Sequence, residues 1–132
     1  MSKHVTTVSE EGYGSTTDVR GEFSVDIDPS GEDAPDTLES LLAAYGACYV
    51  PALRVGAKQR DVGDLGRIEL DVSGTLNDDD KLDGIAFDVA VEADVSEEEG
   101  NQAIDRAFDL CKVHDALKGS LHAETTFEGD AF

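Results

Sequence analysis

The chain contains one long stretch dominated by apolar and small residues, the thirteen from Leu41 to Leu53, none of which is charged. Apolar side chains recur through it at the spacing of one helix face, which predicts a helix that begins at Asp36 or Thr37 and ends near Lys58. The other faces carry small residues, so this helix is apolar almost all round and must lie inside the protein. Thirteen residues are too few to cross a bilayer. The apolar stripe consists of Leu38, Leu41, Leu42, Tyr45, Cys48 and Ala52.

Alternating apolar and polar residues predict strands on both sides of this helix. A capping box, Ser96 with Glu99, opens a second helix that ends at Cys111. The resulting order is β-β-α-β-β-α-β, which makes the chain an α+β protein. The predicted strands are Thr6–Glu10, Thr16–Asp28, residues 67–76, residues 85–92 and Leu121–Phe127.

Thirty acidic residues against ten basic ones give a net charge of −20. A surface with this charge repels phosphate groups, which excludes nucleic acid and anionic membranes as partners. Leu, Ile, Val and Phe still supply 32 of the 132 residues, whereas chains that cannot build a core have less than roughly 20% of these residues. The chain is therefore expected to fold. The acid is dispersed and only five lysines are present, a pattern typical of halophile proteins.

The length suits one domain, residues 1–132, in which residues 1–15 form either a flexible segment or an edge strand. No apolar stretch near Met1 resembles a signal peptide. The two cysteines lie 63 positions apart, a spacing that matches neither a CxxC redox motif nor the disulfide framework of a secreted protein. These features predict a cytoplasmic protein.

The central apolar helix has more apolar surface than one thin sheet can cover. Its faces away from the stripe carry Ala43, Ala44, Gly46 and Ala47, and small residues let another helix approach closely. A second copy of the chain, packed against Ala43, Gly46 and Ala47, would cover this surface. The composition of the helix therefore predicts an obligate homodimer.

The two cysteines are the candidate reactive groups. Cys48 lies within the central helix, and Cys111 ends the second one. A cysteine on an apolar stripe is usually a small hydrophobe, whereas a reactive cysteine needs a neighbouring cation that favours the thiolate. Spacing along the sequence leaves both interpretations open.

Two segments carry residue types that bind metals. Cys111, His114 and His122 could ligate zinc, but the second CxxC or HxxxH pair of a zinc site is absent. The segment from Asp26 begins like a calcium-binding EF-hand loop, but Thr37 stands at the twelfth position in place of glutamate. We interpret both as chance matches, and no metal site is predicted.

Two motifs stand in the order known from one protein family. The first is Thr37-Leu-Glu-Ser-Leu-Leu-Ala-Ala-Tyr-Gly-Ala-Cys48, which resembles an E-x-L-L-A-A-x-x-x-C-like helix. The second is Cys111-Lys-Val-His-Asp-Ala-Leu117, which resembles a C-P-V-x-x-x-L segment with Lys112 in place of proline. Together they resemble the OsmC and organic hydroperoxide resistance family. The resemblance implies the OsmC-like fold, an intertwined homodimer whose central helices are wrapped by two sheets.

The same resemblance implies an activity, the thiol-dependent reduction of organic hydroperoxides or of hydrogen peroxide without a bound cofactor. By position, Cys48 resembles the peroxidatic cysteine, and Cys111 resembles the resolving cysteine. The peroxidatic thiolate attacks the peroxide and becomes a sulfenic acid, which the resolving thiol captures as a disulfide. The implied partners are a second copy of the chain, a hydroperoxide substrate and a dithiol or lipoyl-type reductant.

The resemblance also implies an arginine that activates the peroxidatic thiol and a carboxylate that orients this arginine. Arg20 resembles the arginine, and Glu39, nine positions before the cysteine, resembles the carboxylate. Arg54 and Arg60 compete with Arg20 for this role. At six residues of 100° each, Arg54 is expected to face a different side of the helix from Cys48.

Two further hypotheses remain beside the peroxidase. One is an OsmC-like protein that binds a small apolar or thiol ligand in the dimer cavity without turnover. The other is a structural dimer with inert buried cysteines. Rapid formation of a Cys48–Cys111 disulfide on addition of peroxide distinguishes the peroxidase from both.

Overall fold

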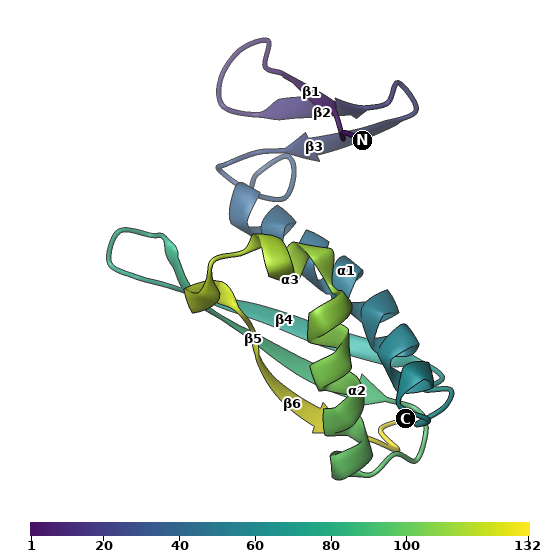
Figure 1. Cartoon of the computed structure of the whole chain (residues 1–132). Helices are drawn as coiled ribbons and strands as arrows, with labels where there is room; N and C mark the ends of the chain where they lie inside the picture. Colours follow the sequence, from purple (N-terminus) through teal and green to yellow (C-terminus); the bar gives the residue numbers. More distant parts are fainter. The chain divides into compact units, whose positions relative to one another are not determined.

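The computed structural model describes residues 1–132 and divides the chain into two compact units, Met1–Leu41 and Leu42–Phe132 (Figure 1). The predicted α+β class is confirmed. The order of elements differs from the predicted one by an additional strand before the first long helix, and by a short helix and a 3₁₀ turn before the last strand.

The first unit holds a three-stranded antiparallel sheet, β1 (Val5–Val8), β2 (Ser15–Val19) and β3 (Phe23–Ile27). The strand predicted over Thr16–Asp28 is wrong, because this segment forms two strands joined by a turn. Arg20 and Gly21 have φ angles of 60° and 72°, and the Asp18 carboxylate accepts a hydrogen bond from the Gly21 N–H. Apolar residues stay at every second position on both sides of this turn, so the hydrophobic pattern predicts one continuous strand.

This sheet is amphipathic, and its apolar side chains are not buried. The register aligns Val5 with Val19, and Val19 with Phe23, so these residues share one face. Phe23 is 57% exposed and Val25 is 45% exposed. The unit buries no apolar side chain, and a three-stranded sheet without a covered face is not stable alone.

Helix α1 (Thr37–Gln59) matches the predicted central helix within a residue at its C-terminal end. It opens with a reciprocal cap, in which the Asp36 N–H donates to the Glu39 carboxylate and the Glu39 N–H donates to the Asp36 carboxylate. None of the helices combines the length and the apolarity needed to span a bilayer. The buried residues of α1 are Tyr45, Gly46, Tyr49, Ala52, Leu53, Gly56 and Ala57.

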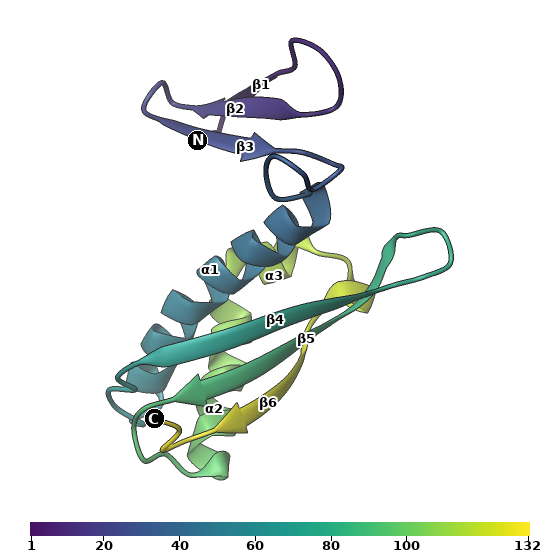
Figure 2. The same ribbon diagram turned by 180° about the vertical axis from the view of Figure 1, so that it is seen from behind.

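The second unit is a three-stranded sheet with helices on one face (Figures 1 and 2). Strands β4 (Ile68–Leu76) and β5 (Leu82–Val91) pair antiparallel, and β6 (Glu124–Glu128) pairs parallel to β5. Figure 2 shows the opposite face of the sheet free of helices. The core beneath the helices is aromatic, with the rings of Tyr45 and Tyr49 centred 4.6 Å and 4.8 Å from the ring of Phe87.

Close approach of α1 to this sheet depends on a glycine. A Cβ atom placed on Gly46 would lie 3.0 Å from Val72 Cγ2. The expectation that Gly46 faces a partner helix is therefore wrong, because it faces β4 of its own chain. Ala43 and Ala47, expected on the same surface, are exposed.

Helix α2 (Glu97–Leu110) begins at the predicted capping box of Ser96 and Glu99 and ends at Cys111. Both parts of that prediction are confirmed. After Cys111 the chain forms the short helix α3 (Lys112–Ala116) and the 3₁₀ turn η1 (Gly119–Leu121) before β6. The strand predicted over Leu121–Phe127 is therefore shifted by three residues at its start.

Most of the acidic charge has no cationic partner. The chain forms only two ion pairs, Arg67 with Glu69 and Arg106 with Asp109, although it carries thirty acidic residues. We expect the protein to lose stability steeply as NaCl falls from about 1 M to about 0.1 M, because the screening length grows from about 3 Å to about 10 Å. Thermal melts followed by circular dichroism across this range test the expectation. An unchanged melting temperature would show that the acidic residues keep the protein soluble without making its stability depend on salt.

Candidate functional site

The second unit brings the two cysteine side chains together. Cys48 lies on α1, Cys111 is the C-terminal cap of α2, and the two thiols lie close enough for each to shift the pKa of the other. Both are free thiols; Cys48 is partly exposed, whereas Cys111 is 1% exposed. The contact joins residues 63 positions apart, which no spacing rule could have predicted.

The surroundings shift the pKa values of the two thiols in opposite directions. Burial alone would raise the pKa of Cys48, but the Val113 N–H, the Cys111 thiol, and the N–H and charge of Lys112 together lower it below the ordinary cysteine value. Burial raises the pKa of Cys111, and the neighbouring Cys48 raises it further. The site therefore favours a thiolate at Cys48 and a neutral thiol at Cys111.

This division suits two-step thiol chemistry. A thiolate that is partly exposed can attack an electrophile from solution. A neutral thiol in contact with it can then displace a leaving group from the modified sulfur, which forms a disulfide. The geometry supplies both groups within one chain.

A hydrogen-bonded tyrosine and histidine lie beside the thiols. The Tyr45 hydroxyl accepts a hydrogen bond from the Ala123 N–H at 3.1 Å and forms a second hydrogen bond with His114 Nδ1 at 2.6 Å. Burial lowers the pKa of His114, and the neighbouring His122 lowers it further. The ring of His122 is centred 3.7 Å from the ring of His114, and its Nε2–H donates to the Leu117 carbonyl.

A surface hollow of about 660 Å³ leads to this region. Its lining includes Cys111, Lys112, His114 and His122, together with part of α2. This volume is in the range of small-molecule pockets. Nowhere in the chain do three His, Cys, Asp or Glu side chains lie close enough to hold a metal ion.

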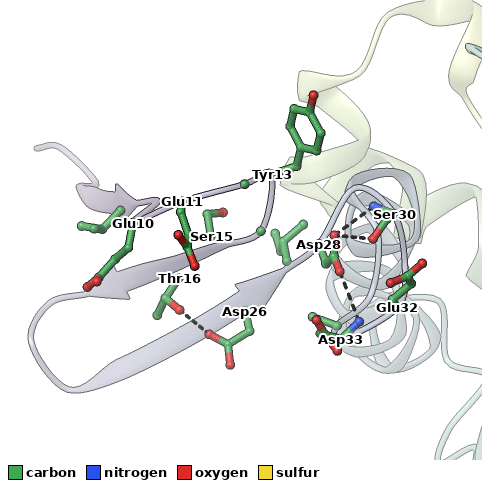
Figure 3. A pocket seen from close by; sticks show the side chains of 15 residues that line it. Glu10, Glu11, Tyr13, Ser15, Thr16, Asp26, Asp28, Ser30, Glu32 and Asp33 are labelled. Carbon is green, nitrogen blue, oxygen red and sulfur yellow. Dashed lines mark hydrogen bonds between the residues drawn. The ribbon is translucent and has the colours of Figure 1, made fainter.

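The first unit has its own hollow of about 710 Å³, which Figure 3 shows with acidic side chains around it. Asp28, the residue that suggested an EF-hand loop, is only 8% exposed. Its carboxylate accepts hydrogen bonds from the Ser30 hydroxyl, the Ser30 N–H and the Asp33 N–H, as Figure 3 shows for these residues. The Ser30 hydroxyl, then the two N–H groups, lower the pKa of Asp28. This carboxylate therefore serves the conformation of its own loop.

The residues that the family resemblance suggested beside the cysteines belong to the first unit. The Arg20 guanidinium lies 5.4 Å from the centre of the Phe23 ring and takes part in neither ion pair. The Glu39 carboxylate caps α1. Arg54 donates to the Gly66 carbonyl at 2.8 Å, and Arg60 lies beyond the end of α1.

Three residues of the site are not predicted from the sequence. Lys112, which replaces the proline of the family motif, keeps a backbone N–H that proline would lack, and this N–H lowers the pKa of Cys48. Tyr45 belongs to the predicted apolar stripe, and His114 belongs to the segment that resembles a zinc site. An arrangement of a tyrosine and a histidine 69 positions apart leaves no local signal in a sequence.

The opposite pKa shifts predict the order of alkylation by iodoacetamide. Cys48 should react with a pH midpoint below that of an ordinary cysteine, because its thiolate persists to lower pH. Cys111 should react with a midpoint above the ordinary value. Peptide mass spectrometry across pH 5–10, with each curve scaled to its own plateau, separates acidity from accessibility. Equal midpoints would contradict the assignment of the thiolate to Cys48.

Comparison with known proteins identifies the family of this chain. Residues 29–126 match the sequence profile described as OsmC-like protein. A protein of uncharacterised function from Haloferax volcanii is 43% identical over 126 residues, which cover 96% of this chain and 95% of the relative. This relative supports the expectation of a halophile-like member.

Solved structures share the fold at low sequence identity. The crystal structure of an OsmC-like protein from Mycoplasma pneumoniae has a TM-score of 0.84 at 19% identity, covering 98% of this chain and 97% of the other. The organic hydroperoxide resistance protein OhrB of Bacillus subtilis has a TM-score of 0.73 at 21% identity, covering 97% and 98%. With a profile match over most of the chain and a 43% identical relative over nearly all of it, the chain belongs to the OsmC-like protein family.

Proposed function

We propose that this protein is a cysteine-based peroxidase that reduces organic hydroperoxides or hydrogen peroxide. The family fold is consistent with a role in peroxide resistance. The observation that carries the proposal is the contact between two free thiols whose pKa values are shifted in opposite directions. Cysteines that serve only to fill the core are not expected to stabilise a thiolate at the more exposed position.

The reaction proceeds in two steps within the chain. The Cys48 thiolate attacks the outer oxygen of the hydroperoxide, the O–O bond breaks, and the alkoxide leaves and takes a proton to become the alcohol. The Cys111 thiol then loses its proton and attacks the Cys48 sulfenic sulfur, and the departing hydroxide leaves as water. An external dithiol or lipoyl-type reductant restores both thiols, so no bound cofactor is required. A thiol cycle of this kind needs a reducing compartment such as the cytoplasm.

We propose that the active form is a homodimer. The apolar face of the β1–β3 sheet is exposed, with Phe23 and Val25 at 57% and 45%. On α1, Ala44, Ala47 and Val55 lie at helical spacing and are also exposed, with Val55 at 45%. A second copy is the proposed partner, because each copy offers the same open apolar surfaces to the other.

The roles of Arg20 and Glu39 are part of this proposal. An arginine can hold a thiolate and a peroxide oxygen together through its planar fork, and a carboxylate keeps that fork oriented. Arg20 is exposed and has no carboxylate partner among the ion pairs, so its guanidinium is available. Only one oxygen of Glu39 is used in the helix cap, which leaves the other free to accept from a guanidinium.

Stoichiometric oxidation tests the proposed function. One equivalent of cumene hydroperoxide per chain, added to the reduced protein in molar salt, should consume both free thiols and form an internal Cys48–Cys111 disulfide. The reaction should finish within seconds, whereas an ordinary thiol reacts far more slowly with peroxide. Mass spectrometry after acid quench and alkylation identifies the pair. Thiols that persist for minutes would favour a ligand-binding protein without turnover.

A further inference from the structure

The Tyr45 hydroxyl joins three segments of the second unit. Tyr45 lies on α1 and is completely buried. Its hydroxyl forms hydrogen bonds with His114 Nδ1 on α3 at 2.6 Å and with the Ala123 N–H, just before β6, at 3.1 Å. No backbone hydrogen bond joins α1 to the segment from Cys111 to Ala123. One buried side chain therefore links α3 and the start of β6 directly to α1.

Both cysteines are close in the chain to the residues that this hydroxyl joins. Cys48 follows Tyr45 by three positions on α1, so the two side chains are neighbours on the helix surface. Cys111 precedes His114 by three positions, and its carbonyl accepts from the Asp115 N–H at 3.2 Å, which closes the first turn of α3. The position of α3 on α1 therefore affects where Cys111 lies relative to Cys48.

We propose that Tyr45 is a positioning residue for disulfide formation, whose hydrogen bond to His114 holds α3 on α1 so that Cys111 stays beside Cys48. The proposal rests on the peroxidase function stated above and concerns its second step. A disulfide tolerates a narrow range of geometry, with Cβ atoms about 3.5–4.5 Å apart. A shift of α3 by about 1 Å is therefore enough to disfavour the bond.

Both partners of the hydrogen bond are fixed by aromatic packing. The ring of Tyr45 is centred 4.6 Å from the ring of Phe87 on β5. The ring of His114 lies 4.5 Å from Phe108 on α2 and 3.7 Å from His122 after η1, measured between ring centres. A side chain locked by its neighbours transmits its position to its own backbone. The hydrogen bond therefore constrains α3 itself and not only the imidazole ring.

The start of α3 also carries groups that act on Cys48. The N–H groups of Lys112 and Val113, the first two residues of α3, lower the pKa of the Cys48 thiol. If Tyr45 holds α3 in place, removal of its hydroxyl should weaken this effect. The acidity of Cys48 is thus a second measure of where α3 lies.

Two pairs of matched variants test the proposal. Tyr45→Phe removes the hydroxyl, and Tyr49→Phe is its control, because Tyr49 is equally buried and bonds to the Ile104 carbonyl on α2. His114→Asn keeps a polar atom near the position of Nδ1, whereas His114→Leu does not. Both lose the imidazole ring, so the difference between them reports the hydrogen bond. Since His114 is only half-buried, this pair remains usable if Tyr45→Phe is unstable.

The first measurement is the equilibrium between the dithiol and the Cys48–Cys111 disulfide. Each protein is equilibrated in molar salt with mixtures of reduced and oxidised dithiothreitol, and alkylation followed by mass spectrometry gives the oxidised fraction. Melting temperatures in the same salt show that each variant is folded. The constant for disulfide formation should fall at least about tenfold in Tyr45→Phe and His114→Leu, and stay within about threefold in Tyr49→Phe and His114→Asn.

The second measurement is the pH midpoint of Cys48 alkylation by iodoacetamide. It should rise toward the ordinary cysteine value in Tyr45→Phe and His114→Leu and stay unchanged in Tyr49→Phe and His114→Asn. A general loss of core packing would not separate the variants in this way.

Wild-type values of both quantities in Tyr45→Phe and His114→Leu would overturn the positioning role and leave the peroxidase intact. An equal loss in Tyr49→Phe would also overturn it, because the effect would then come from core packing. Neither measurement uses peroxide. Failure of the wild type to form a sulfenic acid with cumene hydroperoxide, as trapped by dimedone, would instead overturn the peroxidase without changing the result in dithiothreitol.

Discussion

Replacement of Cys48 by serine is expected to reduce hydroperoxide consumption to the background rate. The serine hydroxyl is nearly the same size as the thiol but is not ionised near neutral pH, so it cannot act as the nucleophile. The fold should persist, because Cys48 is only partly buried at the edge of the α1 core. Loss of cumene hydroperoxide in the presence of dihydrolipoate measures turnover. Turnover that survives in this variant would refute the assignment.

Cys111→Ser is the matched control for this result. It removes the resolving thiol and leaves the attacking one, so one equivalent of peroxide should be consumed rapidly. The Cys48 sulfenic acid should then accumulate and oxidise further to the sulfinic acid when peroxide is in excess. Normal cycling of Cys111→Ser with a dithiol would show that the reductant, and not Cys111, resolves the sulfenic acid.

Ala47→Glu is expected to dissociate the homodimer. Ala47 is exposed on α1 of the single chain, so a glutamate there would harm a monomer little. In the proposed dimer the same position is covered, and an uncompensated buried charge costs about 3–5 kcal/mol. The dissociation constant should rise by at least roughly 100- to 4,000-fold, since each 1.4 kcal/mol is tenfold and both protomers carry the substitution. Sedimentation velocity in molar salt at several concentrations measures this change.

Gln59→Glu is the control for the added charge. It lies on the same helix, is exposed, and keeps the oxygen that accepts from Arg106 Nε at 2.6 Å. This variant should sediment as the wild type does. A wild-type protein that is a folded monomer at micromolar concentration, or equal sedimentation of Ala47→Glu and wild type, would contradict the proposed interface.

Features that depend on neighbours in the chain were predictable from the sequence. The bounds of α1 follow from its apolar periodicity, and the start of α2 follows from the hydrogen bonds between Ser96 and Glu99. The prediction of one strand over Thr16–Asp28 is wrong for a local reason as well, the turn at Arg20. A non-glycine residue with a positive φ forms the β2–β3 turn, and such a residue gives no turn signal when hydrophobic alternation continues on both sides.

The pairing of the cysteines could be inferred before the structure only through resemblance to a family. Nothing in the spacing of Cys48 and Cys111 requires them to meet. The structure adds the physical content of the site: the two thiols in contact, and the N–H groups after Cys111 that favour the thiolate at Cys48. It also shows that Gly46 faces β4 and not a partner, since a Cβ atom there would lie 3.0 Å from Val72 Cγ2.

The α+β class, the central helix, the capping box and the acidic surface are predictable from the sequence, because they depend on residue types and on contacts within a few positions. Which titratable groups face one another depends on how the whole chain packs. Tyr45 and His114 are 69 positions apart, and their hydrogen bond exists because α1 and α3 pack on the same end of the core. The acidity of a thiol depends on burial and on the donors around it, so it is a property of the packed chain and cannot be assigned to a residue type.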